Sequence, residues 1–246
     1  MKQVIVTPAM GKRLIGLALA QHPDVKRVLA KGTLVIVAGT TNGYVAEEIL
    51  RSLREIGFDR TGFRRGVTVA HRSKVAKVEF PGDVVITDGV WLKGKTIDGV
   101  ADTLKQGDMI MKGANAFDPQ GQPAVLIGNE KGGTILVSLA AVVGRRVLLL
   151  MPVGLEKRVV ESVQTLALRC NALDASGPRL LPVPGRIFTE LDAISLLTGA
   201  QACLLAAGGI YGAEGAVYLG INGEDSQVQA TIDMMARIQD EPATRV

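Results

Sequence analysis

Four short loops of this 246-residue chain combine glycine with hydroxyl, amide or charged side chains, and each follows an apolar run. In the first loop, Gly39 and Gly43 enclose Thr40, Thr41 and Asn42. Such a loop at the start of a helix offers free backbone N–H groups and a partial positive charge to an anion. A plain turn in which Thr or Asn caps the helix needs fewer polar residues than these. The loop composition therefore favours an anion site.

The second loop, residues 113–118, leaves a strand that we expect over residues 108–112. Lys112, Asn115 and Asp118 stand at the end of this otherwise apolar strand. Because ligands of open parallel sheets bind beyond the carboxyl ends of the strands, these residues are site candidates. Lys112 would polarise a carbonyl group, and Asp118 would act as a base. A lysine that reaches solvent and an ordinary Asp-Pro turn explain the same residues equally well.

The third loop, residues 128–134, runs into a strongly apolar segment that we expect to be helical. Lys131, Gly132 and Gly133 resemble a phosphate or carboxylate cradle at a helix start. Glu130 is the one acid between residues 118 and 156, and it is placed to act there as a base or nucleophile. A solvated loop in which Thr134 caps the helix is the alternative interpretation.

The fourth loop, residues 152–157, ends at Lys157, which could reach a phosphate. Taken alone, Lys157 is better explained as an ordinary surface lysine near a helix start. All four loops, however, follow buried strands of one predicted sheet, so we expect them to converge on a single cleft. The expected ligand is a small anionic metabolite.

Composition and charge exclude several functional classes. Lys and Arg number 28 against 24 Asp and Glu, a net charge of +4 that is too small for a dedicated nucleic-acid-binding protein. The one dense basic stretch, residues 60–77, contains a single aromatic, Phe63, and is best interpreted as a solvated surface, with a rim that guides anions as the alternative. Two isolated cysteines and two isolated histidines give no metal-binding pattern, and no nucleotide-binding glycine motif is present. We therefore expect no nucleic acid, no metal and no cofactor.

The N-terminus lacks the apolar core of a signal peptide, and the longest apolar stretch, residues 134–143, is too short to span a bilayer. These features predict a cytoplasmic protein without a membrane partner.

The chain alternates between strand and helix patterns. Apolar runs predict strands over residues 33–38, 84–87, 108–112 and 147–151. Helical spacing predicts helices over 8–30, with a break near His22-Pro23, and over 44–56, 134–143 and 156–168. Asp88-Gly89 predicts a hairpin. The expected fold is α/β, with a Rossmann-like, mostly parallel sheet covered by helices on both faces.

A second, smaller domain is predicted at the C-terminus. Three prolines and two glycines within residues 172–185 indicate a linker, which divides a ligand-binding domain, residues 1–177, from residues 178–246. The later segments follow a β-α-β-β-α order, which predicts a ferredoxin-like α+β unit. Its glycine-rich loop, residues 208–215, is best explained as a long hairpin tip, or else as a lid or oligomer contact. We expect a homo-oligomer.

The order of these pieces resembles the superfamily of ribose-5-phosphate isomerase, glucosamine-6-phosphate deaminase and CoA transferases over about two-thirds of the chain. Lys12 lies in an N-terminal helix, and Gly39-Thr40-Thr41 is similar to the isomerase loop "GLGTGST". Residues 112–119, KGANAFDP, look like its "DGADEVDP", and residues 131–133 look like its "KGGGG". Lys157 stands where the isomerase has a phosphate-binding lysine. Lys112 and Asn115 replace two aspartates, and the helix after Gly133 lacks the isomerase glutamate.

Three functions remain open at this stage. The first is an enzyme that acts on a small phosphorylated or carboxylated metabolite in an isomerase-like reaction. The second is CoA or acyl transfer with Glu130 as the nucleophile. The third is a catalytically inactive metabolite sensor, which the missing helix glutamate favours and the surplus of polar residues at the strand ends disfavours.

Overall fold

The computed structural model describes residues 1–68 and 81–242, and its centre is a six-stranded sheet in the order β10-β8-β5-β2-β3-β4. Four neighbouring strands run parallel: β10 (Arg186–Phe188), β8 (Leu148–Pro152), β5 (Met109–Met111) and β2 (Thr33–Ile36). β3 (Val84–Thr87) and β4 (Val90–Trp91) form an antiparallel hairpin at one edge. The predicted Asp88-Gly89 turn is confirmed, with both residues at positive φ. The fold is α/β with a mixed sheet.

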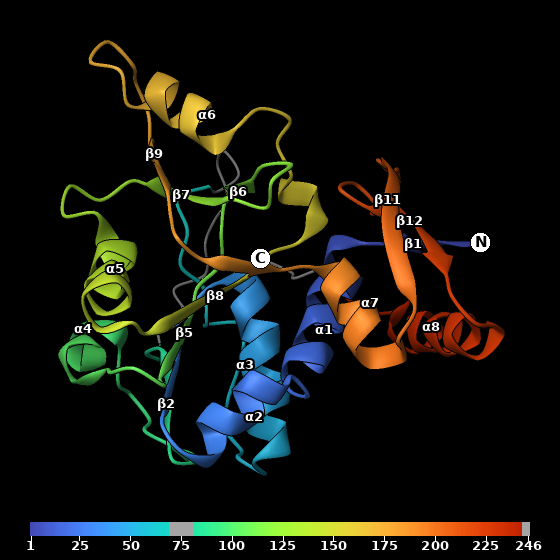
Figure 1. The fold of residues 1–246 in the computed structure, drawn as a ribbon, viewed down its shortest axis with the longest axis horizontal. Helices are drawn as coiled ribbons and strands as arrows, with labels where there is room; N and C mark the ends of the chain where they lie inside the picture. The colour runs from blue at the N-terminus through green and yellow to red at the C-terminus, as the bar shows by residue number, and fades with distance from the viewer. Residues whose placement is uncertain (69–80, 243–246) are drawn as a thin grey trace.

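Helices cover both faces of this sheet (Figure 1). On one side lie α1 (Pro8–Leu19), α2 (Pro23–Ala30) and α3 (Thr40–Ser52). On the other lie α4 (Ile97–Val100), a 3-10 turn (Ala101–Thr103) and α5 (Gly133–Arg145). The predicted break near Pro23 is confirmed, because α2 starts there and His22 caps it through the backbone N–H of Asp24.

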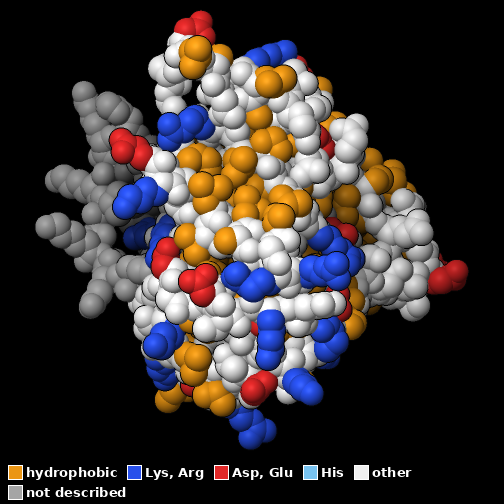
Figure 2. Space-filling view, turned by 60° about the vertical axis from the view of Figure 1, so that its left-hand side comes forward, with side chains coloured by type: hydrophobic (Ala, Val, Ile, Leu, Met, Phe, Trp, Pro, Cys, Tyr) orange, Lys and Arg blue, Asp and Glu red, His pale blue; other side chains and the backbone are white. Residues whose placement is uncertain are grey.

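The apolar helix α5 is only partly covered. Leu136 and Val143 remain 47% and 73% exposed. Figure 2 turns the side of α4 and α5 forward and shows apolar side chains gathered on this face, with lysine and arginine side chains below them. Among the described helices, none combines the length and apolarity needed to cross a bilayer.

A second sheet contradicts two expectations from the sequence. It contains β6 (Ala116–Phe117), β7 (Pro123–Ile127) and β9 (Arg179–Pro182), and β9 lies inside the segment predicted as a linker. The helix predicted over 156–168 is also interrupted. A 3-10 turn (Leu155–Lys157) is followed by Arg158, whose extended backbone bridges to Phe117, and α6 (Val163–Cys170) begins only after its cap, Ser162.

The C-terminal segments form a third sheet together with the first strand. β11 (Gln201–Ala207) and β12 (Val217–Asn222) pair with β1 (Lys2–Val6), and α7 (Glu190–Thr198) and α8 (Asp225–Ile238) accompany them (Figure 1). The predicted order is present, but β10 pairs with β8 in the central sheet, so the ferredoxin-like arrangement is not observed. The boundary at residue 178 stays a prediction. β1, β9 and β10 each pair with a strand from the other side of it.

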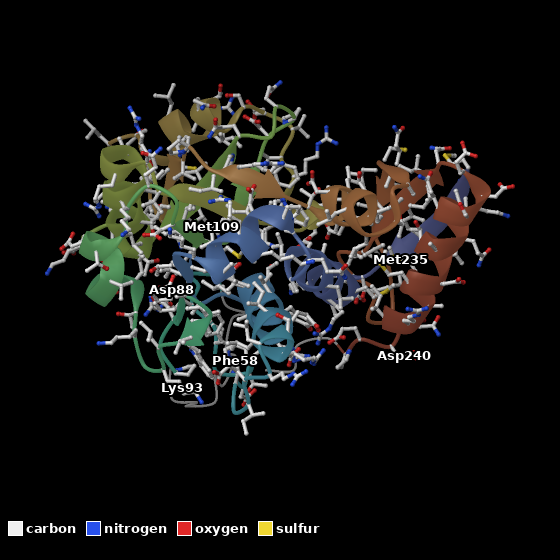
Figure 3. The ribbon with its side chains drawn as sticks, turned by 60° about the horizontal axis from the view of Figure 1, so that its bottom comes forward. Phe58, Asp88, Lys93, Met109, Met235 and Asp240 are labelled. Carbon is white, nitrogen blue, oxygen red and sulfur yellow. The ribbon has the colours of Figure 1, made fainter. Side chains whose placement is uncertain are left out.

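An aromatic cluster anchors the chain after α3. The ring centroid of Phe58 lies 6.1 Å from that of Trp91 in β4 and 5.1 Å from that of Phe63. Lys93 Nζ lies 4.7 Å from the Trp91 ring centroid, and Figure 3 shows Phe58 and Lys93 at the same end of the molecule. This packing positions residues 65–68. The rest of the basic stretch predicted as a solvated surface, residues 69–77, lies outside the described residues.

A cluster of buried ion pairs fixes the C-terminal end of the chain. Arg13 of α1 donates from Nε to Glu241 Oε2 at 2.8 Å, and Arg60 Nη2 donates to Glu241 Oε1 at 3.0 Å. The side chains of Arg13 and Glu241 are 11% and 12% exposed. Both guanidinium groups also stack on the Tyr44 ring, at 4.8 and 4.3 Å from its centroid.

We expect Glu241→Gln to lower the free energy of unfolding by about 2 kcal/mol, because it removes the carboxylate shared by two poorly solvated guanidinium groups and leaves Glu47 as their remaining common counter-charge. Urea denaturation at neutral pH measures the loss. The matched control is Glu161→Gln, which breaks an exposed pair with Arg169 and should change stability by less than about 0.5 kcal/mol. Equal effects of the two substitutions would contradict this account.

Candidate functional site

A cavity of about 750 Å³ receives residues from all four of the predicted loops. It lies where the parallel strands β2, β5 and β8 end, which is the edge at which open sheets bind ligands. Ten of the predicted site residues line it: Gly39, Thr40, Thr41, Asn42, Lys112, Asn115, Lys131, Gly132, Gly133 and Lys157. The loops of the sequence analysis therefore meet at one place.

Two long helices begin at this cavity without a side-chain cap. α3 starts after Gly39 and α5 after Gly132, and neither has an acidic residue in its first turn. Their first backbone N–H groups and the positive ends of their dipoles are therefore left for a ligand. Gly132 adopts φ 76°, and a Cβ there would collide with the side chain of Leu136. Glycine is thus required for the tight entry into α5.

Asn42 holds the ends of β2 and β5 together beneath the cavity. Its Nδ2 donates to the carbonyl oxygens of Val37, at 2.7 Å, and Met111, at 3.1 Å. Asn42 is 1% exposed, and its Oδ1 is buried without a hydrogen-bond partner among residues 1–68 and 81–242. The structure thus gives Asn42 a positioning role, since Lys112 follows Met111 directly.

The amine of Lys112 has a lowered pKa. Burial lowers the pKa of Lys112 to about 8, against the opposing effect of the Asp83 carboxylate and together with the nearby Arg65 cation. Asp83 is committed elsewhere: its Oδ1 accepts from Ala38 N at 2.9 Å and its Oδ2 from Ile97 N at 2.8 Å. Arg65 Nη1 lies 3.8 Å from Asp83 Oδ2. Among the described residues, the Lys112 amine therefore forms no ion pair with a carboxylate.

The structure places the remaining predicted residues away from the cavity lining. Asp118 is buried; its Oδ1 accepts from Gln120 N and Gln122 N, both at 3.0 Å, and its Oδ2 from Val163 N at 3.2 Å. These bonds tie the β6–β7 turn to α6, and they use the carboxylate that was expected to act as a base. Glu130 is exposed on the loop before α5, and Gly43 packs under Arg60 inside α3.

Sequence reasoning missed two charged residues that line the cavity, Asp98 and Arg65. Asp98 is exposed in the first turn of α4 and is the carboxylate among the lining residues. No local motif surrounds either residue, because both reach the cavity through tertiary packing from segments that precede β5.

A second titratable cluster adjoins Lys157. The Lys157 amine forms an ion pair with Glu156. Lys12 of α1 lies nearby, and burial, together with repulsion from Lys157, lowers the pKa of Lys12. Glu190 is fully buried at the start of α7, where its Oε2 accepts from Leu155 N at 3.0 Å. Burial, with repulsion from Glu156, raises the pKa of Glu190 to about 7. Gly11 leaves room for this carboxyl group, because a Cβ there would collide with Glu190 Oε1.

We expect Glu190→Gln to gain stability relative to the wild type as pH rises from 5 to 8. The raised pKa means that the unfolded chain ionises near the ordinary value of 4.5 while the folded chain keeps its proton to about 7, so wild-type stability falls across this window. The difference should reach about 2–3 kcal/mol by pH 8 and be absent below pH 4.5. Thermal unfolding of both proteins over this range measures it, and parallel curves would contradict the assignment.

Comparisons with known proteins leave the family open. No protein-family model and no curated protein sequence matches this chain. Among solved structures, the crystal structure of ribose 5 phosphate isomerase A from Neisseria gonorrhoeae aligns with 97% of this chain and 86% of that chain, at 13% identity and a TM-score of 0.33. A likeness at this TM-score shows neither a common fold nor a common activity.

Proposed function

We propose that this chain is an enzyme that binds a small phosphorylated or carboxylated metabolite in the cavity and acts on its carbonyl group in an isomerase-like reaction. The observation that carries the proposal is the convergence of positive charge on one cavity. The uncapped starts of α3 and α5 line it together with Lys112, Lys131 and Lys157. An anion bound there would satisfy backbone N–H groups and neutralise cations at once.

The anionic end of the ligand belongs between the two helix starts. Thr40 and Thr41 add hydroxyl donors at the first helix, and Lys131 precedes the second. Lys157 is a weaker candidate for direct contact, because Glu156 already neutralises it. In this arrangement the backbone supplies most of the anion's hydrogen bonds. Because such bonds require no particular side chain, glycine-rich loops are sufficient to bind the anion.

The carbonyl end would then face Lys112 at the end of β5. An isomerase moves a proton between adjacent carbons, so it needs a base and a group that stabilises the negative oxygen of the enediolate. The ammonium form of Lys112 meets the second need. Asp98 is the lining carboxylate for the first need, in place of Glu130 and Asp118.

A catalytically inactive metabolite sensor is the second candidate, and one observation favours it. Apart from Asp98, which is exposed, the cavity lining within the described residues contains no carboxylate. Binding without turnover of any sugar phosphate or hydroxy-carbonyl acid would select the sensor. Acyl transfer through Glu130 has no comparable support, because Glu130 does not line the cavity.

We expect millimolar inorganic phosphate to raise the melting temperature of the wild type and to leave that of Thr134→Asp unchanged. Aspartate in the first turn of α5 suits the helix dipole, so the protein stays folded, but its charge repels the anion. Phosphate at 100 times its Kd adds about 2.7 kcal/mol of stability.

The matched control is Thr165→Asp, an exposed threonine in the first turn of α6 that does not line the cavity. This variant should respond to phosphate as the wild type does. An equal phosphate response in Thr134→Asp and Thr165→Asp would reject the anion site.

A further inference from the structure

The surroundings of the Lys112 amine suit a nucleophile better than a fixed cation. Lys112 leaves the end of β5, a strand that is paired on both sides by β2 and β8, and its backbone N–H donates to Leu150 O at 3.1 Å. The backbone at Lys112 is therefore held rigidly by the sheet. Around it the cavity lining includes the apolar residues Ala38, Ala114 and Ile135. An amine in such a setting is poorly hydrated, which favours its neutral form.

No carboxylate among the described residues forms an ion pair with Lys112, although Asp83 favours its ammonium form from nearby. The nearby acid, Asp83, is 1% exposed and its two oxygens accept from Ala38 N and Ile97 N, and Arg65 is its ion-pair partner at 3.8 Å. Within residues 1–68 and 81–242, Lys112 Nζ makes neither an ion pair nor a hydrogen bond. Arg65 and Lys131 place further positive charge at the same cavity, and exposed Asp98 is the one lining carboxylate that opposes them.

We infer that the Lys112 amine forms an imine with the carbonyl carbon of an anionic aldehyde or ketone bound in this cavity. The inference rests on the proposed function for the binding of the anionic end, and it adds a covalent step. A partly buried amine close to another cation and without an ion-paired carboxylate is the pattern by which proteins activate lysine toward carbonyl groups.

The chemical step balances without a further reactant. The neutral amine adds to the carbonyl carbon, and one of its protons moves to the carbonyl oxygen to give a carbinolamine. The hydroxyl group then takes a second proton from solvent. The oxygen then leaves as water, and the nitrogen keeps one proton as a cationic imine. Water reverses the step. The cationic imine withdraws electrons from the adjacent carbon, so it can assist the proton transfer of an isomerase-like reaction.

The fraction of neutral amine supports the same chemistry. A pKa of about 8 leaves roughly a tenth of the Lys112 amine neutral at pH 7, about 300 times the fraction expected at the ordinary pKa of 10.5. Imine formation should accordingly rise as pH increases through about 8. Asp83 and Arg65 are the charged groups that act on the pKa of Lys112, and Lys131 and Asp98 line the same cavity.

Reductive trapping tests the imine. The full-length protein is incubated with glyceraldehyde 3-phosphate and sodium cyanoborohydride, which reduces an imine to a stable secondary amine, and peptide mass spectrometry locates the adduct. We expect labelling at Lys112 to exceed labelling at the exposed Lys93 by at least tenfold, and inorganic phosphate to suppress it. Lys112→Arg, which keeps the charge, should remove the main adduct, whereas Lys93→Arg should retain it.

Two results separate this inference from the proposed function. If phosphate stabilises the wild type but labelling merely follows the exposure of each lysine, the imine is rejected and the anion site stands. If Lys112 is labelled equally by glyceraldehyde and its phosphate, and phosphate stabilises nothing, the amine is a nucleophile and the anion site is rejected. Labelling of the wild type at Lys112 and its competition by phosphate do not depend on whether Lys112→Arg folds.

Discussion

The amide group of Asn42 joins the two strands from which the candidate site is built. Asn42 Nδ2 donates hydrogen bonds to Val37 O and Met111 O, and Met111 O also accepts from Val37 N at 2.9 Å. These bonds fix the carboxyl ends of β2 and β5 against each other inside the core. Gly39 follows β2 and Lys112 follows β5, so the start of α3 and the candidate reactive amine are held in one geometry. Loss of this amide would remove the side-chain donor to the buried Val37 carbonyl, at a cost of about 1–3 kcal/mol, whereas Met111 O would keep its bond from Val37 N.

The charge distribution makes ligand binding and the protonation of Lys112 interdependent. Two helix starts and several cations line the cavity, and exposed Asp98 is the carboxylate among its described lining residues. Burial, together with repulsion from Arg65, lowers the pKa of Lys112, which leaves part of the amine neutral when the cavity is empty. A bound anion would favour the protonated amine, and by linkage the protonated amine would favour the anion. The same cavity can therefore hold an anion by its charge and meet a carbonyl group with its amine.

Local patterns predicted the parallel strands, the helices α1 to α3 and the loops that meet at the cavity, because apolar runs and glycine-rich turns act over a few residues. Long-range pairing was not predictable in this way. β9 lies in a proline-rich segment that resembles a linker, and β1 pairs with β12, a strand near the other end of the sequence. Asp118 lies away from the cavity lining for a similar reason, since one of its hydrogen bonds comes from Val163 N, 45 residues further along the chain. The place of Asp98 in the cavity lining and the burial of Glu190 both depend on tertiary packing.

The central claim is that an anion binds between the starts of α3 and α5. Nuclear magnetic resonance of the ¹⁵N-labelled protein tests it directly during a titration with inorganic phosphate. The account predicts that the largest saturable shifts fall on the backbone amides of residues 40–42 and 133–135, because these N–H groups would donate to the anion. Saturable shifts confined to exposed lysine- and arginine-rich surfaces, with the amides of both helix starts unchanged, would contradict it.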